Sequence, residues 1–259
     1  MKNVTPFLAI AIATLCASAV PAADKKDATI VRDYTDVVAP PDQAAYETGV
    51  KRFNQCLAQH GYKFAWTAWV HETGDTYTYS YTTDPLAWES FDAMHAQGAA
   101  CDAALRAEVN PHLKRETSSF IQIMPELSHM PNNMGLGTGY IEVTNFKLKP
   151  GHEASEAFTT AAKKITAAAE KSKWPNYYSI GMIRDGGDDD APDFVLVSPA
   201  KSWAELEKDA DPSVWQMVEN VYGKEAGKAI RKSVNDALQS VTSHVDSYSE
   251  SLTYKPSGK

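Results

Sequence analysis

One pattern of predicted elements occurs twice in this chain, and this repetition limits the possible fold more than any other feature. When the sequence is displaced by 115 positions, Trp88 falls on Trp203, Tyr62 on Tyr177 and Val50 on Ile165. The two copies agree in pattern more than in identity. Self-similarity at a fixed offset indicates repeated structural units, so we expect two related units in one chain.

The second copy shows the order of elements clearly. A strand ends at the turn pair Pro150-Gly151, and an Ala- and Lys-rich helix with apolar residues at helical spacing follows. An Asp- and Gly-rich turn then joins two strands into a hairpin. The order predicted is strand, helix, hairpin, a short helix around Trp203, a long helix and a last strand, at residues 140–148, 152–173, 177–184 with 193–198, 213–240 and 241–254.

The first copy repeats this order. Two alternating segments flank Gly74-Asp75, which is a good hairpin signal. The segment 128–139 is rich in Pro, Asn and Gly, so we interpret it as a linker. The predicted elements are a strand at 28–38, a helix at 42–60, a hairpin of 64–73 with 76–83, helices at 85–98 and 100–114, and a strand at 118–127.

Each copy therefore predicts a ferredoxin-like β-α-β-β-α-β unit of the α+β class, with repeats at 23–127 and 140–259. The duplicated order, with a Trp opening the second helix at Trp88 and Trp203, resembles the dimeric α/β-barrel superfamily in a tandem form. The resemblance implies that the two repeats cover each other's sheets as an intramolecular dimeric α/β-barrel-like unit. The superfamily includes cofactor-independent monooxygenases, haem enzymes, isomerases and stress proteins, so fold does not choose among them.

The first residues predict export. One Lys precedes an apolar run, and small residues end it near Ala22, as in a secretory signal peptide at 1–22. The run is too short for a membrane-spanning helix, although an uncleaved anchor is the alternative. Leu15 before Cys16 argues against lipidation. We expect a periplasmic or secreted protein without a membrane span.

Charge and cysteine content add two expectations. The formal net charge of −8 disfavours nucleic acid as a partner. Cys56 and Cys101 remain after removal of a signal peptide, and an oxidising compartment favours a disulfide between them. The alternative is two buried free thiols.

In barrels of the superfamily the ligand space lies inside, between the two sheets or between sheet and helices, so we expect the hairpin strands to supply the site. The aromatic and polar side chains there suit a flat or hydrophobic small molecule, or they serve only as core packing. His71 could act as a base or a haem ligand, or it could be a surface residue. The ligand-binding candidates are Trp66, Trp69, His71, Tyr79, Tyr81 and Arg184, with Tyr77, Tyr177, Tyr178 and Met182 as further lining residues.

Motifs for a metal or a nucleotide are missing from the sequence. No two histidines have the helical spacing that presents a pair of ligands, so we predict no metal site. The acidic segment 185–193 departs from the EF-hand pattern and reads as a hairpin tip. The glycines of 135–139 precede a strand, not a helix, and therefore belong to the linker. The sequence requires no cofactor, and no catalytic residue can be named.

The functional hypotheses follow from these candidates. The first is an exported protein that binds a small hydrophobic or aromatic ligand, or a stress-related interaction module. The alternative is a cofactor-independent monooxygenase or isomerase, and the second alternative is a haem-binding protein. The chain could be a monomer with an internal pseudo-dimer or a homodimer.

Overall fold

A computed structural model describes residues 28–131, 135–137, 139–187 and 190–256. The predicted signal peptide, residues 1–22, lies outside the described residues, as does part of the predicted linker. No helix in the described part of the chain is both long and apolar enough to cross a membrane.

The first half follows the predicted order with shifted boundaries. Its strands are β1 (Ile30–Val38), β2 (Trp66–His71), β3 (Thr78–Thr83) and β4 (Leu113–Ile123). Its main helix, α1, buries Tyr46, Val50 and Leu57 at helical spacing against the sheet. The helices are η1 (Pro40–Asp42), α1 (Gln43–Gln59), α2 (Ser90–Gly98), η2 (Ala99–Cys101), α3 (Asp102–Ala104), η3 (Leu105–Val109), η4 (Asn110–His112) and η5 (Pro125–Leu127).

The second half has the same order with longer helices. Its strands are β5 (Tyr140–Leu148), β6 (Ser179–Gly186), β7 (Phe194–Ala200) and β8 (Leu238–Tyr248). The Ser213 hydroxyl and the Gln216 side chain form a capping box that fixes the start of α6. The helices are α4 (His152–Ser172), α5 (Trp203–Leu206), α6 (Val214–Tyr222) and α7 (Lys224–Ala237).

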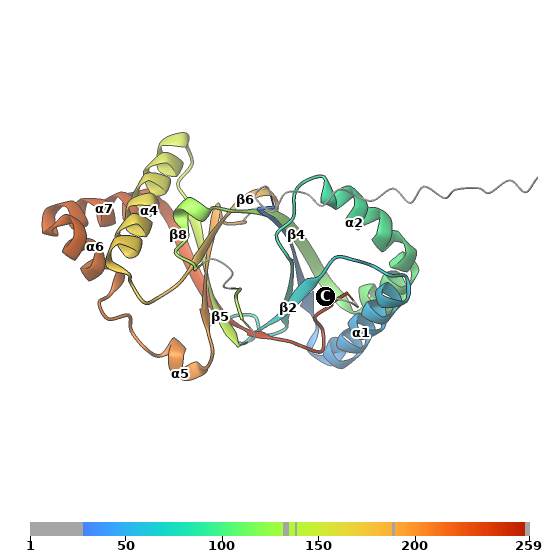
Figure 1. Cartoon of the computed structure of the whole chain (residues 1–259). Coiled ribbons are helices and arrows are strands. Elements are labelled where there is room, and N and C mark those ends of the chain that lie inside the picture. Colours follow the sequence, from blue (N-terminus) through green and yellow to red (C-terminus); the bar gives the residue numbers. More distant parts are fainter. Residues whose placement is uncertain (1–27, 132–134, 138, 188–189, 257–259) are drawn as a thin grey trace, which may run out of the picture.

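The eight strands form one closed antiparallel barrel in the order β1-β3-β2-β8-β5-β7-β6-β4. The fold class predicted from sequence, two ferredoxin-like repeats whose separate sheets cover each other, is therefore wrong. The halves join edge to edge: β2 pairs with β8, and β4 pairs with β6. Figure 1 shows the resulting ring of strands between two groups of helices.

Edge pairing has a clear physical cause. A separate four-stranded sheet would leave unpaired N–H and C=O groups along β2 and β4, and closure removes both edges. The alternation of side chains predicts which faces are buried, but it does not identify the neighbour of an edge strand. The prediction therefore captured the elements and missed how they close.

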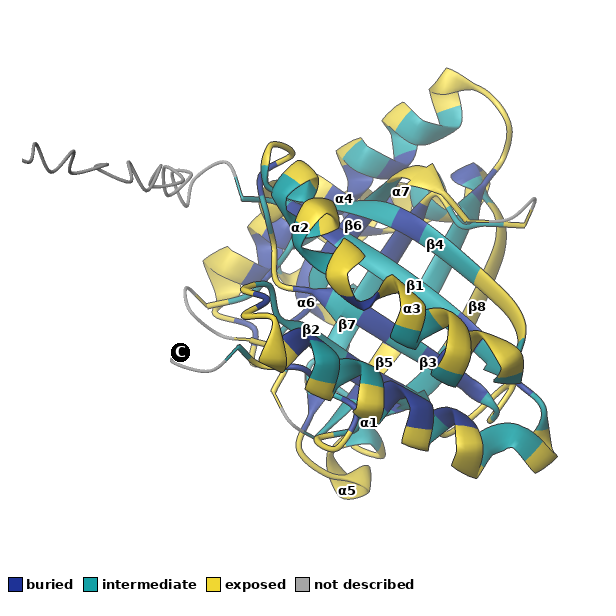
Figure 2. Ribbon diagram, turned by 90° about the vertical axis from the view of Figure 1, so that its right-hand side faces the viewer, coloured by how far each residue is buried: buried dark blue, intermediate teal, exposed yellow. Residues whose placement is uncertain are grey.

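Helices cover the barrel on two opposite sides (Figure 1). The helices α4, α6 and α7 pack on the second half around Phe158, Met217 and Val218. On the first half, α1 and η3 pack on the sheet around Tyr46 and Tyr79. Figure 2 shows that α1, α2 and α3 place their exposed residues outward, away from β1, β3 and β4.

A third set of apolar side chains comes from the strands of both halves. Trp69 of β2 clusters with Ile141 and Val143 of β5 and with Val195 of β7. Strands so far apart in the barrel can share a cluster only across its interior, so these side chains point inward. By alternation, Trp66, Ala68 and Val70 of β2 point outward to the helices.

The predicted disulfide is confirmed. Cys56 on α1 and Cys101 in η2 are joined, with sulfur atoms 2.06 Å apart. The bond links α1 to the chain that follows α2, and Cys101 is fully buried. It therefore ties together two helical segments that cover the same sheet.

Candidate functional site

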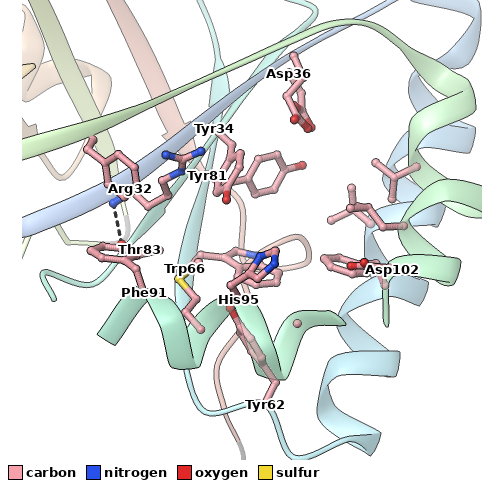
Figure 3. A pocket seen from close by; sticks show the side chains of 18 residues that line it. Arg32, Tyr34, Asp36, Tyr62, Trp66, Tyr81, Thr83, Phe91, His95 and Asp102 are labelled. Carbon is pink, nitrogen blue, oxygen red and sulfur yellow. Dashed lines mark hydrogen bonds between the residues drawn. The ribbon is translucent and has the colours of Figure 1, made fainter. Parts of the chain in front are cut away.

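A cavity of about 530 Å³ lies between the first-half sheet and the helices α1, α2 and η3. We call it the sheet–helix pocket. It is on the outer face of the barrel wall, because the residues of β1 that line it are the outward-pointing Arg32, Tyr34 and Asp36. Figure 3 shows these side chains with Tyr81 and Trp66 around one space, with α2 along its lower edge.

Aromatic rings form much of the pocket wall. Phe53 of α1 stacks on Trp66 of β2, with ring centroids 5.9 Å apart and planes 12° from parallel. Tyr62 tilts against the other side of the same cluster, 5.9 Å from Trp66. Phe91 and Phe120 meet edge to face at 5.0 Å. Flat apolar walls of this kind favour a flat apolar ligand.

Arg32 contributes a positive charge to this wall. Its guanidinium carbon lies 4.1 Å from the centroid of the Phe120 ring and 4.9 Å from that of Tyr34. Its Nη2 donates a hydrogen bond of 2.8 Å to Ser118 Oγ, and its backbone N–H donates to Thr83 Oγ1 at 2.9 Å. The Ser118 hydrogen bond and the two rings hold the guanidinium in place, where it can polarise a carbonyl or neutralise an oxyanion.

Asp36 contributes a buried carboxyl group. Only 5% of its surface is exposed. The Tyr46 hydroxyl donates a 2.6 Å hydrogen bond to Asp36 Oδ2, and the Tyr46 and Tyr81 hydroxyls are hydrogen-bonded at 2.8 Å. Asp36 Oδ1 has no hydrogen-bond partner among the described residues. One oxygen of this carboxyl group is thus held by a tyrosine pair, and the other is buried on the side where Glu116 interacts with Asp36.

The surroundings of Asp36 change its acidity. Burial raises its pKa from the ordinary 3.8 to about 7, the Tyr46 hydrogen bond opposes the rise, and Glu116 adds to it. Burial also raises the pKa of Tyr81 well above 10, so this hydroxyl keeps its proton. Asp36 can therefore accept or release a proton near neutral pH, as a general acid or base must.

The structure divides the six predicted ligand-binding residues among different places. Trp66 and Tyr81 line the sheet–helix pocket. Tyr79 shares their outward face, but its hydroxyl donates to Glu47 Oε1 at 2.9 Å beneath α1. Trp69 and His71 share the inner face of β2, and Arg184 on β6 is exposed. The six residues therefore do not converge, and their role in binding stays a prediction.

Two of the further predicted residues, Tyr177 and Tyr178, line a second pocket on the other half of the molecule. This pocket is wider, at about 1310 Å³, and is bounded by Trp174, Leu196 and Trp215. The carboxylates that line it, Glu142, Glu205, Asp209 and Asp211, are all exposed. Tyr178 itself is tied to Thr166, with the two hydroxyl oxygens 3.0 Å apart. The carboxylates of the second pocket are thus exposed to solvent, unlike the buried Asp36 of the first pocket.

Sequence reasoning missed Arg32, Asp36 and Phe120. The strand containing Arg32 and Asp36 was predicted, and a signal was present in it. In the run Tyr34, Asp36, Val38, every second residue faces the helices, so Asp36 is an acidic residue on a buried face. A buried acidic residue requires a partner or a function. Phe120 carried no comparable signal.

The haem hypothesis concerns this same pocket. His95 of α2 lines it (Figure 3), but the residue as a whole is exposed. An imidazole can serve as an axial haem ligand, yet no side chain among the described residues hydrogen-bonds to that of His95 in the way that Ser118 holds Arg32. Haem binding stays a prediction.

Comparison with known proteins supports the fold. No protein-family model matches the sequence, and no curated protein matches it. Among solved structures, an anthrone oxidase-like protein is similar over 90% of this chain and 95% of its own, with 13% identity and a TM-score of 0.55. A monooxygenase-like protein of Lactobacillus acidophilus is similar over 88% and 97%, with 9% identity and a TM-score of 0.50.

A monooxygenase-like protein of Fusobacterium nucleatum is similar over 85% of this chain and 92% of its own, with 12% identity and a TM-score of 0.50. These proteins belong to the dimeric α/β-barrel superfamily. The chain shares their fold. Because the identities are so low, the comparison says nothing more than this about the chain.

Proposed function

We propose that this protein binds a flat, mainly apolar small molecule bearing a carbonyl or an acidic hydroxyl group in the sheet–helix pocket. The observation that carries the proposal is the combination of aromatic walls with Arg32 and Asp36 in one cavity of about 530 Å³. The walls would stack on the ring system. The two polar groups would select an oxygen substituent, with Arg32 accommodating an oxyanion and Asp36 exchanging a proton.

A specific observation favours a second candidate, a cofactor-independent oxygenase. With its pKa raised to about 7, Asp36 can take a proton from an activated C–H group at neutral pH. Arg32 would stabilise the resulting enolate. That electron-rich anion can reduce O₂ directly, and a CH₂ group plus O₂ gives a carbonyl group plus water. The anthrone oxidase-like and monooxygenase-like proteins with the same fold agree with this chemistry.

Binding is tested by filling the pocket. Gly98 lines it in a helical conformation, and a Cβ there would meet only Tyr62, at 3.8 Å. Gly98→Leu should therefore occupy the cavity without strain. We expect anthrone and anthraquinone to raise the melting temperature of the wild type in proportion to the logarithm of ligand concentration, and to leave Gly98→Leu unchanged.

Ala96→Leu on the exposed face of the same helix is the matched control, and it should respond like the wild type. If a panel of flat aromatic ketones and phenols leaves the wild type unchanged, the binding proposal fails. Equal shifts in wild type and Gly98→Leu would place the ligand elsewhere.

The oxygenase candidate needs a separate measurement. Oxygen uptake with anthrone, corrected for the uncatalysed rate, should occur with the wild type and fall by about 100-fold or more in Asp36→Asn, since general bases contribute at least that much. Asp36→Asn should still bind the ligand, because the amide oxygen can accept from Tyr46. If the wild type binds anthrone but takes up no oxygen, the oxygenase proposal is wrong and the binding proposal stands.

We also propose that the protein is exported, with cleavage near residue 22. The confirmed disulfide supports an oxidising compartment, where such bonds persist. Cell fractionation and N-terminal sequencing of the mature protein test this proposal. Retention of residues 1–22 in a reducing compartment would contradict it.

A further inference from the structure

A second cluster of polar side chains lies inside the barrel, away from the sheet–helix pocket. His71 comes from β2, and His244 and Asp246 come from β8. We call these three residues the seam triad. The Nε2 atoms of His71 and His244 lie 3.7 Å and 3.4 Å from Asp246 Oδ1. The ligand atoms of all three side chains are within 4.8 Å of one another.

The backbone fixes this arrangement. His71 and Asp246 are directly opposite in the β2–β8 ladder. Just beyond the ladder, Glu72 N–H donates to the Val245 carbonyl at 2.8 Å, and Val245 N–H donates to Thr73 Oγ1 at 2.8 Å. His244 and Asp246 are two residues apart on one strand and so share its inner face. The imidazole rings stack at 4.2 Å between centroids.

One oxygen of the Asp246 carboxylate is buried without a hydrogen bond. The residue is 2% exposed, and its Oδ1 accepts no hydrogen bond from the described residues. The histidine side chains are 12% and 18% exposed, so the cluster can be reached from solvent. Buried charges in proteins are paired or coordinate metals, and a carboxylate beside two imidazole nitrogens at these distances can do either.

We propose that His71, His244 and Asp246 bind a divalent transition-metal ion, with zinc as the reference ion, inside the barrel. Two imidazoles and one carboxylate match the preferences of zinc and of its neighbours in the first transition row. Zinc bonds of about 2.0–2.1 Å in a tetrahedron place neighbouring ligand atoms about 3.3 Å apart. The observed 3.4 and 3.7 Å are close to that value, and the ligand atoms of the two histidines are within 4.8 Å of each other.

One neighbouring contact of His71 is compatible with this assignment. Ser80 Oγ lies 3.3 Å from His71 Nε2, a long contact that a metal bond would replace.

The site leaves a coordination position open. With three protein ligands, a tetrahedral ion has room for one water molecule or an anionic ligand. The triad lies on the inner face of the sheet, whereas the sheet–helix pocket lies on the outer face. The metal proposal therefore stands or falls independently of the proposed function.

The test is metal titration of the purified protein after treatment with a chelator and dialysis. Calorimetry with Zn²⁺ should show one equivalent bound to the wild type, and Co²⁺ should give a visible ligand-field spectrum that Zn²⁺ abolishes. His244→Ala and Asp246→Asn should each weaken binding by roughly 100-fold or more, because loss of an outer-shell partner alone costs 10–100-fold.

His112→Ala is the matched control. His112 also lies beside a carboxylate, with its Nδ1 3.8 Å from Asp42 Oδ1, but it belongs to no potential metal-binding group in the part of the chain that the structure describes. This variant should bind like the wild type. Circular dichroism checks that each variant is folded, and His71→Gln provides a third variant if one of the others is not. No binding by the wild type, or equal binding by the folded triad variants, overturns the proposal and leaves an Asp–His network without a metal.

Discussion

At the scale of single residues, Asp36 shows how the fold changes the chemistry of a side chain. Its carboxyl group is chemically the same as that of any aspartate. Its position under α1 and against Tyr46, however, removes it from water. The result is a pKa of about 7, more than three above the ordinary 3.8. The residue therefore has one effect on reactivity and another on stability.

The stability effect has a defined sign. Between pH 4 and 7 the folded protein keeps the Asp36 proton that the unfolded chain has lost. Stability from this group is therefore present at low pH and is lost as pH rises through about 7. Asp36→Asn should remove this part of the pH dependence and raise stability at pH 8, by at most about 4 kcal/mol. Urea unfolding across pH 4–8 measures it, and parallel profiles for the two proteins would contradict it.

The sequence predicted only part of the pocket at this scale. Trp66 and Tyr81 were candidates because aromatic residues alternate in the hairpin strands. The sequence marked His71 as a single candidate, but it did not predict the seam triad. The members of the triad come from strands that are far apart in the chain, and no local spacing records that His71 will face Asp246. Only the closure of the barrel brings them together.

At the scale of elements, the closure between β4 and β6 depends on a glycine. Gly186 has a positive φ of 88°, and a Cβ there would lie 2.2 Å from the Ser118 carbonyl oxygen of β4. Gly61, after α1, also has a positive φ, 69°, but open space surrounds it. A side chain at Gly186 would be disfavoured by the backbone conformation and would also clash with β4. At Gly61 only the backbone conformation disfavours a side chain.

These two positions make a matched pair of substitutions. Gly61→Ala should cost about 1 kcal/mol of unfolding free energy from the left-handed backbone. Gly186→Ala should cost at least about 2 kcal/mol more, because the strand must also move away from β4. Denaturant unfolding measures both values. Equal losses would mean that the β4–β6 contact tolerates a side chain at Gly186.

Element types were more predictable than element limits. Apolar periodicity indicated the helix at 152–173, and the structure has α4 at His152–Ser172. The predicted helix at 100–114 is instead a series of short helical turns that gives way to β4 at Leu113. Pro111 explains why the helical stretch ends before residue 114, because proline removes a backbone donor within a helix.

At the scale of the whole molecule, the two halves complete one barrel. The order of elements was predicted from the repeat, whereas the arrangement of the sheets was not. Pairing of β2 with β8 and of β4 with β6 is made by backbone groups, which leave no pattern in the side chains. The same pairing explains why the inward faces carry the Trp69 cluster and the seam triad.

This architecture predicts that neither half is stable as a monomer. Expression of residues 28–127 alone leaves the edges of β2 and β4 unpaired, so we expect self-association or an unfolded chain. Light scattering coupled to size-exclusion chromatography distinguishes these outcomes from the behaviour of the whole chain. A monodisperse, folded monomer of the first half would contradict the dependence on barrel closure.

The central claim is that ligand binding takes place between the first-half sheet and its helices. The most direct measurement is a crystal structure of the protein grown with a flat tricyclic ketone such as anthrone. We expect a ring system between Trp66 and Phe91, with its oxygen toward Arg32 or Asp36. Density for the ligand inside the barrel or in the second-half pocket would contradict it.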